Sequence, residues 1–106
     1  MNYTPDSWVI LKIAGNDPHY RVLGGWSGSY LYGTSWRMNS GIVKVEDAGD
    51  YFIFHGSSGS TYECRKGGYG IRTSMMEPIS YYTKKHPDKV TVMDENTDWV
   101  GMFNNG

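Results

Sequence analysis

The sequence predicts a mainly β fold of the α+β class, built as a small antiparallel β-barrel-like sheet or a strongly curved meander. Three observations carry this prediction: apolar and polar residues alternate over short segments, turn-forming residues separate these segments, and a helical pattern occurs once. We expect about six or seven strands and one helix in the C-terminal half. A chain of 106 residues has the usual size of one domain, so residues 1–106 are expected to form a single domain.

The first strands are predicted from alternation that is interrupted by turn residues. Residues 8–14 place Val9, Leu11 and Ile13 on one face, and the sequence "GNDP" ends this strand because its residues favour turn geometry. A second strand is expected over residues 19–26, where the "GG" pair indicates a bulge or a close approach of another segment. One or two short strands should follow around Gly33.

The clearest hairpin joins residues 42–46 to residues 51–55 through the tight loop "DAGD". Its alternation predicts four inward-facing side chains, namely Val43, Val45, Phe52 and Phe54.

After "GSSGS", residues 61–66 alternate again, with Tyr62 and Cys64 on one side. The following "GG" predicts a turn into a further strand over residues 69–72, "YGIR". This would complete a second hairpin.

The single helical pattern lies between residues 73 and 86, with Met75, Ile79 and Tyr82 on one face and Pro87 after its end. The sequence allows two positions for the start of this helix. Ser74 and Glu77 have the spacing of a capping box, whereas Pro78 would be better tolerated as the first residue of a helix that begins at Glu77.

The C-terminal segment is predicted to add one strand and a hydrophobic plug. Val90 and Val92 face inward in a strand over residues 89–93. The sequence "DENTDW" then begins a turn or short helix that would bury Trp99 and Phe103.

Composition restricts the function classes. The formal net charge of −1 and the pI near 6.3 provide no global field for a polyanion, so nucleic acid is possible but not favoured as a partner. The single cysteine, Cys64, rules out an internal disulfide and a Cys-based zinc site, which suits a reducing cytoplasm. The longest apolar run has a lysine inside it, so neither a signal peptide nor a membrane span is predicted.

The common catalytic and cofactor motifs are not found. The glycine-rich segments lack the GK[ST] sequence of a phosphate loop and the second glycine of a nucleophile elbow. The three histidines have no metal-ligand spacing, and "DENTDW" departs from a calcium loop at its glycine and glutamate positions. A dyad of Cys64 with His55 is conceivable, but a core role for Cys64 is favoured. No cofactor or metal is predicted, and the enzyme question stays open, leaning against catalysis.

Interleaved aromatic and basic residues provide the positive signal. They predict a binding surface for a protein partner or for self-association, because tyrosine, tryptophan and arginine are enriched at interface hot spots. A small β-barrel that binds single-stranded nucleic acid is one alternative, and a small enzyme or small-ligand binder is another. The reading in which these rings are mostly core packing also remains open. The candidate binding residues are Trp26, Tyr30, Tyr32, Trp36, Arg37, Tyr62, Arg65, Lys66, Tyr69 and Arg72.

Three blocks carry a family resemblance: "HYRVLGGWSGSYLYGTSWRMNSGI", "GDYFIFHGSSGSTYECRKGGYGIR" and "NTDW". They resemble a group of short uncharacterised proteins encoded by tailed marine bacteriophages, notably cyanophages. The resemblance implies a setting, the cytoplasm of an infected marine bacterium, with a place in the virion as the alternative. It supplies no catalytic residue and no cofactor.

Overall fold

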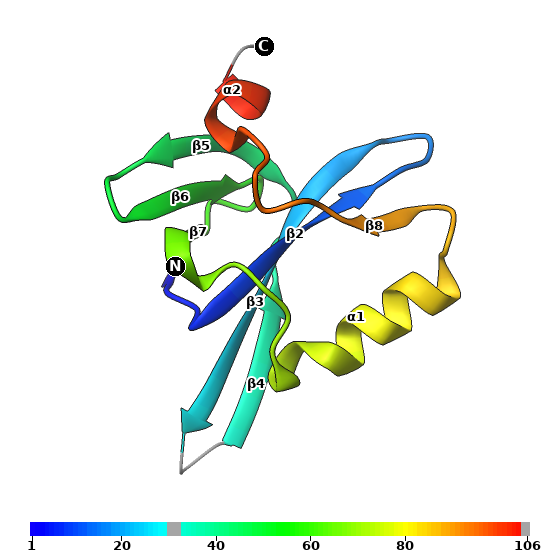
Figure 1. The fold of residues 1–106 in the computed structure, drawn as a ribbon. Helices are drawn as coiled ribbons and strands as arrows, with labels where there is room; N and C mark the ends of the chain where they lie inside the picture. The colour runs from blue at the N-terminus through cyan, green and yellow to red at the C-terminus, as the bar shows by residue number, and fades with distance from the viewer. Residues whose placement is uncertain (30–32, 105–106) are drawn as a thin grey trace.

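Two four-stranded sheets form the framework of the protein (Figure 1). A computed structural model describes residues 1–29 and 33–104. The first sheet, called the β5 sheet, has the order β1 (Asn2–Tyr3), β7 (Thr61–Arg65), β6 (Tyr51–Gly56) and β5 (Ile42–Asp47). The second, called the β3 sheet, has the order β4 (Gly33–Met38), β3 (His19–Ser29), β2 (Ser7–Ile13) and β8 (Val90–Val92).

The predicted mainly β, α+β class is confirmed, but the strands divide between two sheets and do not close into one barrel. The described residues form eight strands, compared with the six or seven predicted. The strand β1 was not predicted, because two residues are too few to show an alternation pattern. It pairs in parallel with β7, with Asn2 opposite Thr61. The strand expected over residues 69–72 is not formed. A short 3-10 helix, η1 (Lys66–Gly68), turns the chain there, and Tyr69 makes only an isolated bridge to Trp8.

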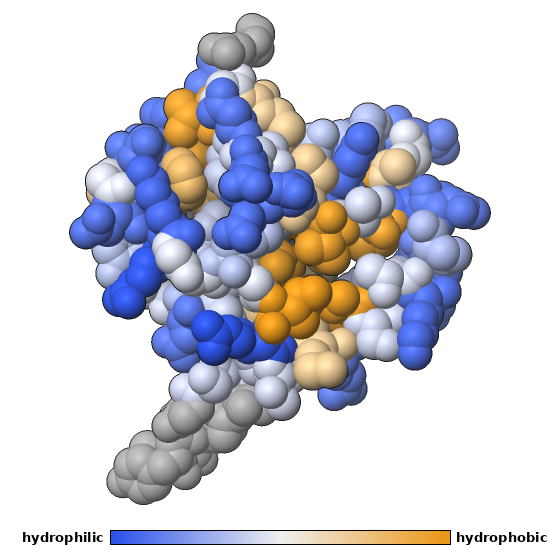
Figure 2. Space-filling model, viewed as in Figure 1, coloured by the Kyte–Doolittle hydropathy of each residue, from blue (hydrophilic) through white to orange (hydrophobic). Residues whose placement is uncertain are grey.

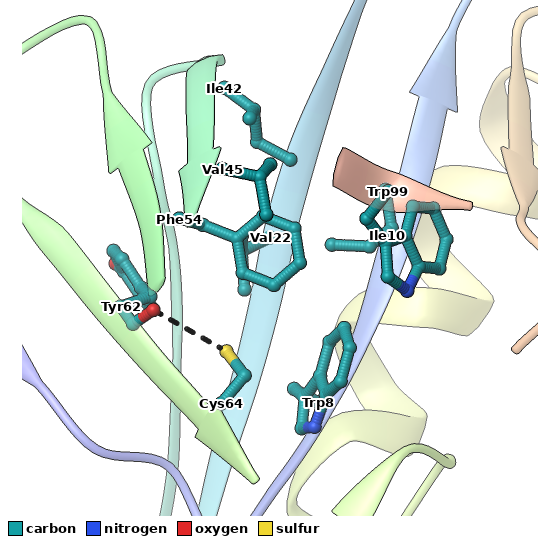
Figure 3. Packing of buried hydrophobic residues seen from close by; sticks show 9 residues of the cluster. All are labelled: Trp8, Ile10, Val22, Ile42, Val45, Phe54, Tyr62, Cys64 and Trp99. Carbon is teal, nitrogen blue, oxygen red and sulfur yellow. Dashed lines mark hydrogen bonds between the residues drawn. The ribbon is translucent and has the colours of Figure 1, made fainter. Parts of the chain in front are cut away.

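The main core lies between the two sheets. Figure 3 shows its side chains pointing toward one another from β2 and β3 on one side and from β5, β6 and β7 on the other. Trp99 from the C-terminal segment joins them, as predicted. Tyr62 and Cys64 both point into this core, which confirms that they share one side of β7. Cys64 therefore has the predicted role of a small buried residue.

A second core lies on the opposite face of the β3 sheet. There Val9, Leu11 and Leu23 pack against Met75 and Ile79 of α1 (Thr73–Lys85). The strand β2 is consequently buried on both faces from Ser7 to Leu11, and its sequence reads as a nearly continuous apolar run. The predicted apolar face of the helix is confirmed.

The helix predicted between residues 73 and 86 is confirmed as α1, but neither of the two N-terminal caps expected from the sequence is formed. The helix begins at Thr73, with Arg72 at the N-cap and no side-chain cap hydrogen bond. Pro78 lies inside the helix, where it cannot donate a backbone hydrogen bond to the preceding turn. Packing compensates for this loss, because Ser74, Met75 and Pro78 are all buried. Tertiary contact thus overrides the local signals for a later start.

The β5–β6 hairpin is confirmed, but the inward position predicted for Val43 is wrong. A register shift between Ile42 and Lys44 inserts an extra residue into β5. Ile42 and Val45 therefore both point inward, while Val43 is 59% exposed. Phe54 is fully buried, and Phe52 is partly buried against the main core.

The C-terminal helix α2 (Trp99–Asn104) covers the outer edge of β5. Asp98 caps the helix by accepting a hydrogen bond from the Gly101 N–H at 3.0 Å. At its other end, the Asn104 amide donates to the Val45 carbonyl at 2.6 Å and accepts from the Val45 N–H at 3.3 Å. An unpaired backbone edge is thereby capped by a side chain.

The Gly24–Gly25 pair allows the close approach that the sequence indicated. A Cβ atom at Gly25 would lie 2.5 Å from the Ser74 Oγ and 2.6 Å from the Met75 Cγ. At Gly24, a Cβ would lie 2.9 Å from the Pro5 Cβ. Both faces of β3 are therefore in contact with other segments at this point.

Substitution of Gly25→Ala tests this contact. We expect a loss of about 1–3 kcal/mol in the free energy of unfolding, because α1 must move away from β3. Chemical denaturation measures the change. Gly67→Ala is the matched control, since a Cβ there would meet no atom within 4 Å. Equal stabilities of the two variants would contradict this account of the packing.

Candidate functional site

The pairing of β3 with β4 divides the predicted aromatic surface between two faces. Trp26 is paired with Ser35, and Trp36 is paired with Gly25, so the two tryptophans point to opposite sides of the sheet. Trp36 lies on the face that carries α1 and is 43% exposed. Of the other candidates in this segment, Tyr30 and Tyr32 lie outside the described residues.

Trp26 and Arg37 share the face that turns toward the β5 sheet, and Tyr3 connects them. The Arg37 guanidinium lies over the Tyr3 ring, 4.7 Å from its centroid. The Trp26 ring makes an edge contact with Tyr3 at 6.4 Å, and its Nε1–H donates to the Thr4 carbonyl at 3.0 Å. The Tyr62 ring lies 5.0 Å from Tyr3 on the other side. Three predicted residues thus meet around Tyr3, which the sequence reading missed because β1 is too short to show a pattern.

A pocket of about 250 Å³ opens beside this aromatic cluster, between the ends of β3 and β4 and the β6–β7 turn. Its lining includes two arginines, one asparagine, three serines and two tyrosines, and no carboxylate. The lining residues are Tyr3, Arg21, Arg37, Met38, Asn39, Ser40, Ser58, Ser60 and Tyr62. We call this hollow the arginine pocket.

The side chains of the arginine pocket are held by specific contacts. The Arg21 Nε–H donates to the His19 Nε2 at 2.9 Å, and the Asn39 Oδ1 accepts from the buried Val22 N–H at 2.8 Å. Ser40 Oγ accepts from the Ser58 N–H at 3.0 Å, which ties the β6–β7 turn to the end of β4. In the part of the chain that is described, neither Arg21 nor Arg37 forms an ion pair with an acid.

The outer edge of β4 is adjacent to the arginine pocket. The Asn39 N–H donates to the Val22 carbonyl, so this pair is hydrogen-bonded. In an antiparallel ladder every second pair is hydrogen-bonded, so the next bonded pair is Arg37 with Gly24, and the pairs of Met38 and Trp36 are not bonded. The Gly25 carbonyl accepts instead from the Asp6 N–H, on the opposite side of β3. The backbone groups of Trp36 and Met38 consequently point away from β3. They form an edge that can accept another strand.

The predicted residues near η1 do not form one surface with this edge. The Lys66 Nζ bonds to the Asp47 carboxylate at 2.7 Å and lies over the Phe52 ring. Arg65 is exposed beside Tyr51, and Arg72 is exposed at the start of α1. Figure 1 shows η1 on one side of the molecule and the lysine-bearing end of α1 on the other. These basic groups therefore do not form the single positive face that a nucleic acid would need.

Tyr69 is a packing residue with two defined hydrogen bonds. Its hydroxyl donates to the Met93 carbonyl at 2.6 Å and accepts from the Ile10 N–H at 3.1 Å. Its ring makes an edge contact with Trp8 at 4.7 Å. Burial raises the pKa of Tyr69 to about 12. Burial likewise raises the pKa of Tyr62, in the main core, to about 12, against a small opposing effect of the nearby Arg37 charge.

The candidate catalytic residues are not assembled into a reactive site. Burial raises the pKa of the Cys64 thiol, whose Sγ contacts the Tyr62 carbonyl at 3.8 Å inside the core. His55 instead lies 3.5 Å from Glu46 on the hairpin. Hydrogen bonds from His55 and Lys44 lower the pKa of this carboxyl. Residues 1–29 and 33–104 contain no group of three or more potential metal ligands.

A second hollow, of about 260 Å³, bears on the small-ligand alternative. It is mainly apolar and lies between the C-terminal half of α1 and the β3 sheet, and Ile13, Met38, Tyr82 and Val90 line it together with Arg21, His86 and Lys89. Figure 2 shows apolar side chains at the surface between α1 and β8. No buried polar group is directed at a ligand there, so the arginine pocket is the better defined site.

Comparison with models of protein families, with curated protein sequences and with solved structures finds no match to this chain. Among the described residues, no helix has the length and apolar character needed to cross a bilayer.

The two buried tyrosines predict how stability depends on alkaline pH. Their pKa is near 10 in the unfolded chain and about 12 in the folded protein, so the folded state keeps protons that the unfolded state loses. This contribution is fully present below pH 10 and is lost as the pH rises through 12. Urea denaturation over this range should show falling stability, with a smaller decrease in Tyr69→Phe. A decrease in Tyr69→Phe as large as in the parent protein would contradict this assignment.

Proposed function

We propose that this chain is a non-enzymatic protein-binding module that takes an extended segment of its partner as an added strand along β4. The observation that carries this proposal is the unpaired backbone edge at Trp36 and Met38. Such an edge offers main-chain hydrogen bonds for affinity, and the alternating side chains beside it provide specificity.

The other sheet edges are less suitable. The strand β1 has two residues and β8 has three. The Asn104 amide occupies the backbone of β5 at Val45. The strand β4 is longer, with six residues. It contains neither proline nor lysine, the residues that commonly protect an exposed edge from pairing. Figure 1 also shows that the β3–β4 hairpin projects away from the rest of the molecule. A partner strand can therefore approach it.

The side chains of β4 suggest which partner sequence would fit. An added strand places alternate residues on the two faces of the sheet. On one face it would meet the exposed Trp36 ring, which favours an apolar or aromatic residue. On the other it would meet Arg37, which favours an acidic residue. We therefore expect a partner segment in which apolar and acidic residues alternate.

Within this proposal, the biological setting comes from the resemblance of the three sequence blocks to phage proteins. We place the partner in the cytoplasm of an infected bacterium, with a virion protein as the alternative. The β4 edge of a second copy of this chain is an alternative occupant, which would make the interaction self-association. The formal charge of −1 and the separated basic groups do not support nucleic acid in this role.

Selection from a displayed random-peptide library tests the proposal. We expect the full chain to enrich extended peptides with alternating apolar and acidic residues. Affinity for a selected peptide should fall at least about tenfold in Trp36→Pro, because the variant lacks one outward N–H and the exposed ring. Tyr81→Ala is the matched control, since Tyr81 is an exposed aromatic residue on α1. Its affinity should equal that of the parent protein.

Amide hydrogen exchange gives a direct readout of strand addition. The N–H groups of Trp36 and Met38 should exchange faster than that of Arg37 in the free protein and become protected in the peptide complex. Trp36→Ser, which retains the backbone N–H, controls for a folding defect in Trp36→Pro. The proposal fails if selected peptides bind Trp36→Pro and the parent protein equally well, or if binding leaves exchange at β4 unchanged. If the β4 amides become protected from exchange as the protein concentration rises, without any peptide, the edge would instead be assigned to a second copy of this chain.

A further inference from the structure

We propose that the arginine pocket binds a phosphate monoester or a free phosphate ion. This inference goes beyond strand addition at β4, because the pocket lies at the end of the two sheets and, apart from Arg37 and Met38, is lined by residues that a docked strand would not need. The pocket is distinct from a phosphate loop, since the β6–β7 turn is followed by a strand and contributes hydroxyl groups.

The first argument is charge. Arg21 from β3 and Arg37 from β4 both line the pocket, and no carboxylate lines it. The two side chains start from opposite faces of the β3 sheet, and an anion in the hollow would be attracted by both guanidinium charges. Glu46 and Asp47 of the β5–β6 hairpin are paired with Lys44, His55 and Lys66. An anion from outside would therefore be stabilised here.

Both arginines are oriented before any ligand binds. The Arg21 Nε–H donates to His19, and the His19 Nδ1 lies 2.8 Å from the Asp17 carbonyl, which suits a ring protonated on Nδ1. One terminal nitrogen, Nη1, lies 4.0 Å from the Met38 Sδ, which is a weak acceptor, so an anion in the pocket would be the stronger partner. Stacking on Tyr3 holds Arg37 in a similar way. Less side-chain entropy is lost on binding when the donors are already held in place.

Neutral donors complete the lining. Ser58 and Ser60 contribute hydroxyls from the β6–β7 turn, which Ser40 holds through its contacts with the Ser57 hydroxyl and the Ser58 N–H. The Asn39 amide is 4% exposed, and its Nδ2 has no hydrogen-bond partner. A small shift of this side chain would bring an otherwise unsatisfied buried donor to a ligand oxygen, which is favourable because an unpaired buried donor is costly.

The set of donors fits phosphate better than a carboxylate. A phosphate monoester carries close to two charges at neutral pH and has three terminal oxygens, so it can accept from two guanidinium groups and several hydroxyls together. A carboxylate has one charge and two oxygens in a plane. The volume of about 250 Å³ equals about eight water molecules, which leaves space for a phosphoryl group and a few atoms of an ester substituent.

Titration of the full chain with inorganic phosphate, followed by two-dimensional NMR at constant ionic strength in chloride, tests the proposal. We expect saturable shifts at Asn39, Ser58 and Ser60 and at the side-chain Nε–H of both arginines. Arg21→Gln and Arg37→Gln should each weaken binding about tenfold or more, as expected when a charge-assisted hydrogen bond is lost. Arg72→Gln is the matched control, because Arg72 is exposed at the start of α1, and it should bind as the parent protein does.

Glycerol 2-phosphate, compared with inorganic phosphate, distinguishes the source of the group. Tighter binding of the ester indicates a phosphorylated molecule, and equal binding indicates the free ion. The proposal is overturned if acetate shifts the same resonances at equal concentration, or if Arg21→Gln and Arg37→Gln bind phosphate as the parent does. It is also overturned if phosphate produces no saturable shift. Trp36→Pro should retain phosphate binding, so a failure of strand addition and a failure of the pocket give different results.

Discussion

Burial of Trp8 between the two sheets is the constraint on which the rest of the structure depends. Its ring lies 4.7 Å from Tyr69, 5.3 Å from Phe54 and 6.3 Å from Trp99, so one side chain contacts the β5 sheet, the segment before α1 and the C-terminal helix. Its Nε1–H donates to the Arg65 carbonyl at 2.7 Å. This hydrogen bond satisfies the indole inside an apolar core and holds the end of β7 against β2.

The arrangement around Trp8 explains where the free surfaces lie. Strand β2 is covered on both faces, and the outer edge of β5 is covered by α2, so the central part of the molecule offers little exposed backbone. The β3–β4 hairpin extends beyond this central part (Figure 1). Its edge strand, together with Arg37 above Tyr3, is therefore where the proposed partner strand would bind. The arginine pocket lies beside it because the β6–β7 turn is tied to Ser40 at the end of β4.

Much of the fold was predictable because burial on one face leaves a clear period in the sequence. The hairpin of β5 and β6, the shared side of Tyr62 and Cys64, and the burial of Trp99 all followed from such patterns. The failures have specific causes. A bulge moved Val43 outward, and α1 forms without either expected cap and with Pro78 inside it, because burial of Met75 and Pro78 compensates for the lost local hydrogen bonds. Neither a bulge nor a packing contact of this kind leaves a local signal.

The sequence by itself determined the class of fold, the positions of most strands and the supply of aromatic and basic residues for a surface. Only the tertiary structure decided which of those residues meet. Strand pairing placed Trp26 and Trp36 on opposite faces. Trp36 is paired with Gly25, the residue next to Trp26, and successive residues of a strand point to opposite faces. Packing buried Tyr69 and brought Tyr3, Arg21 and Asn39 to the same pocket as Arg37. These contacts join residues far apart in the chain, and a one-dimensional pattern holds no information on such distances.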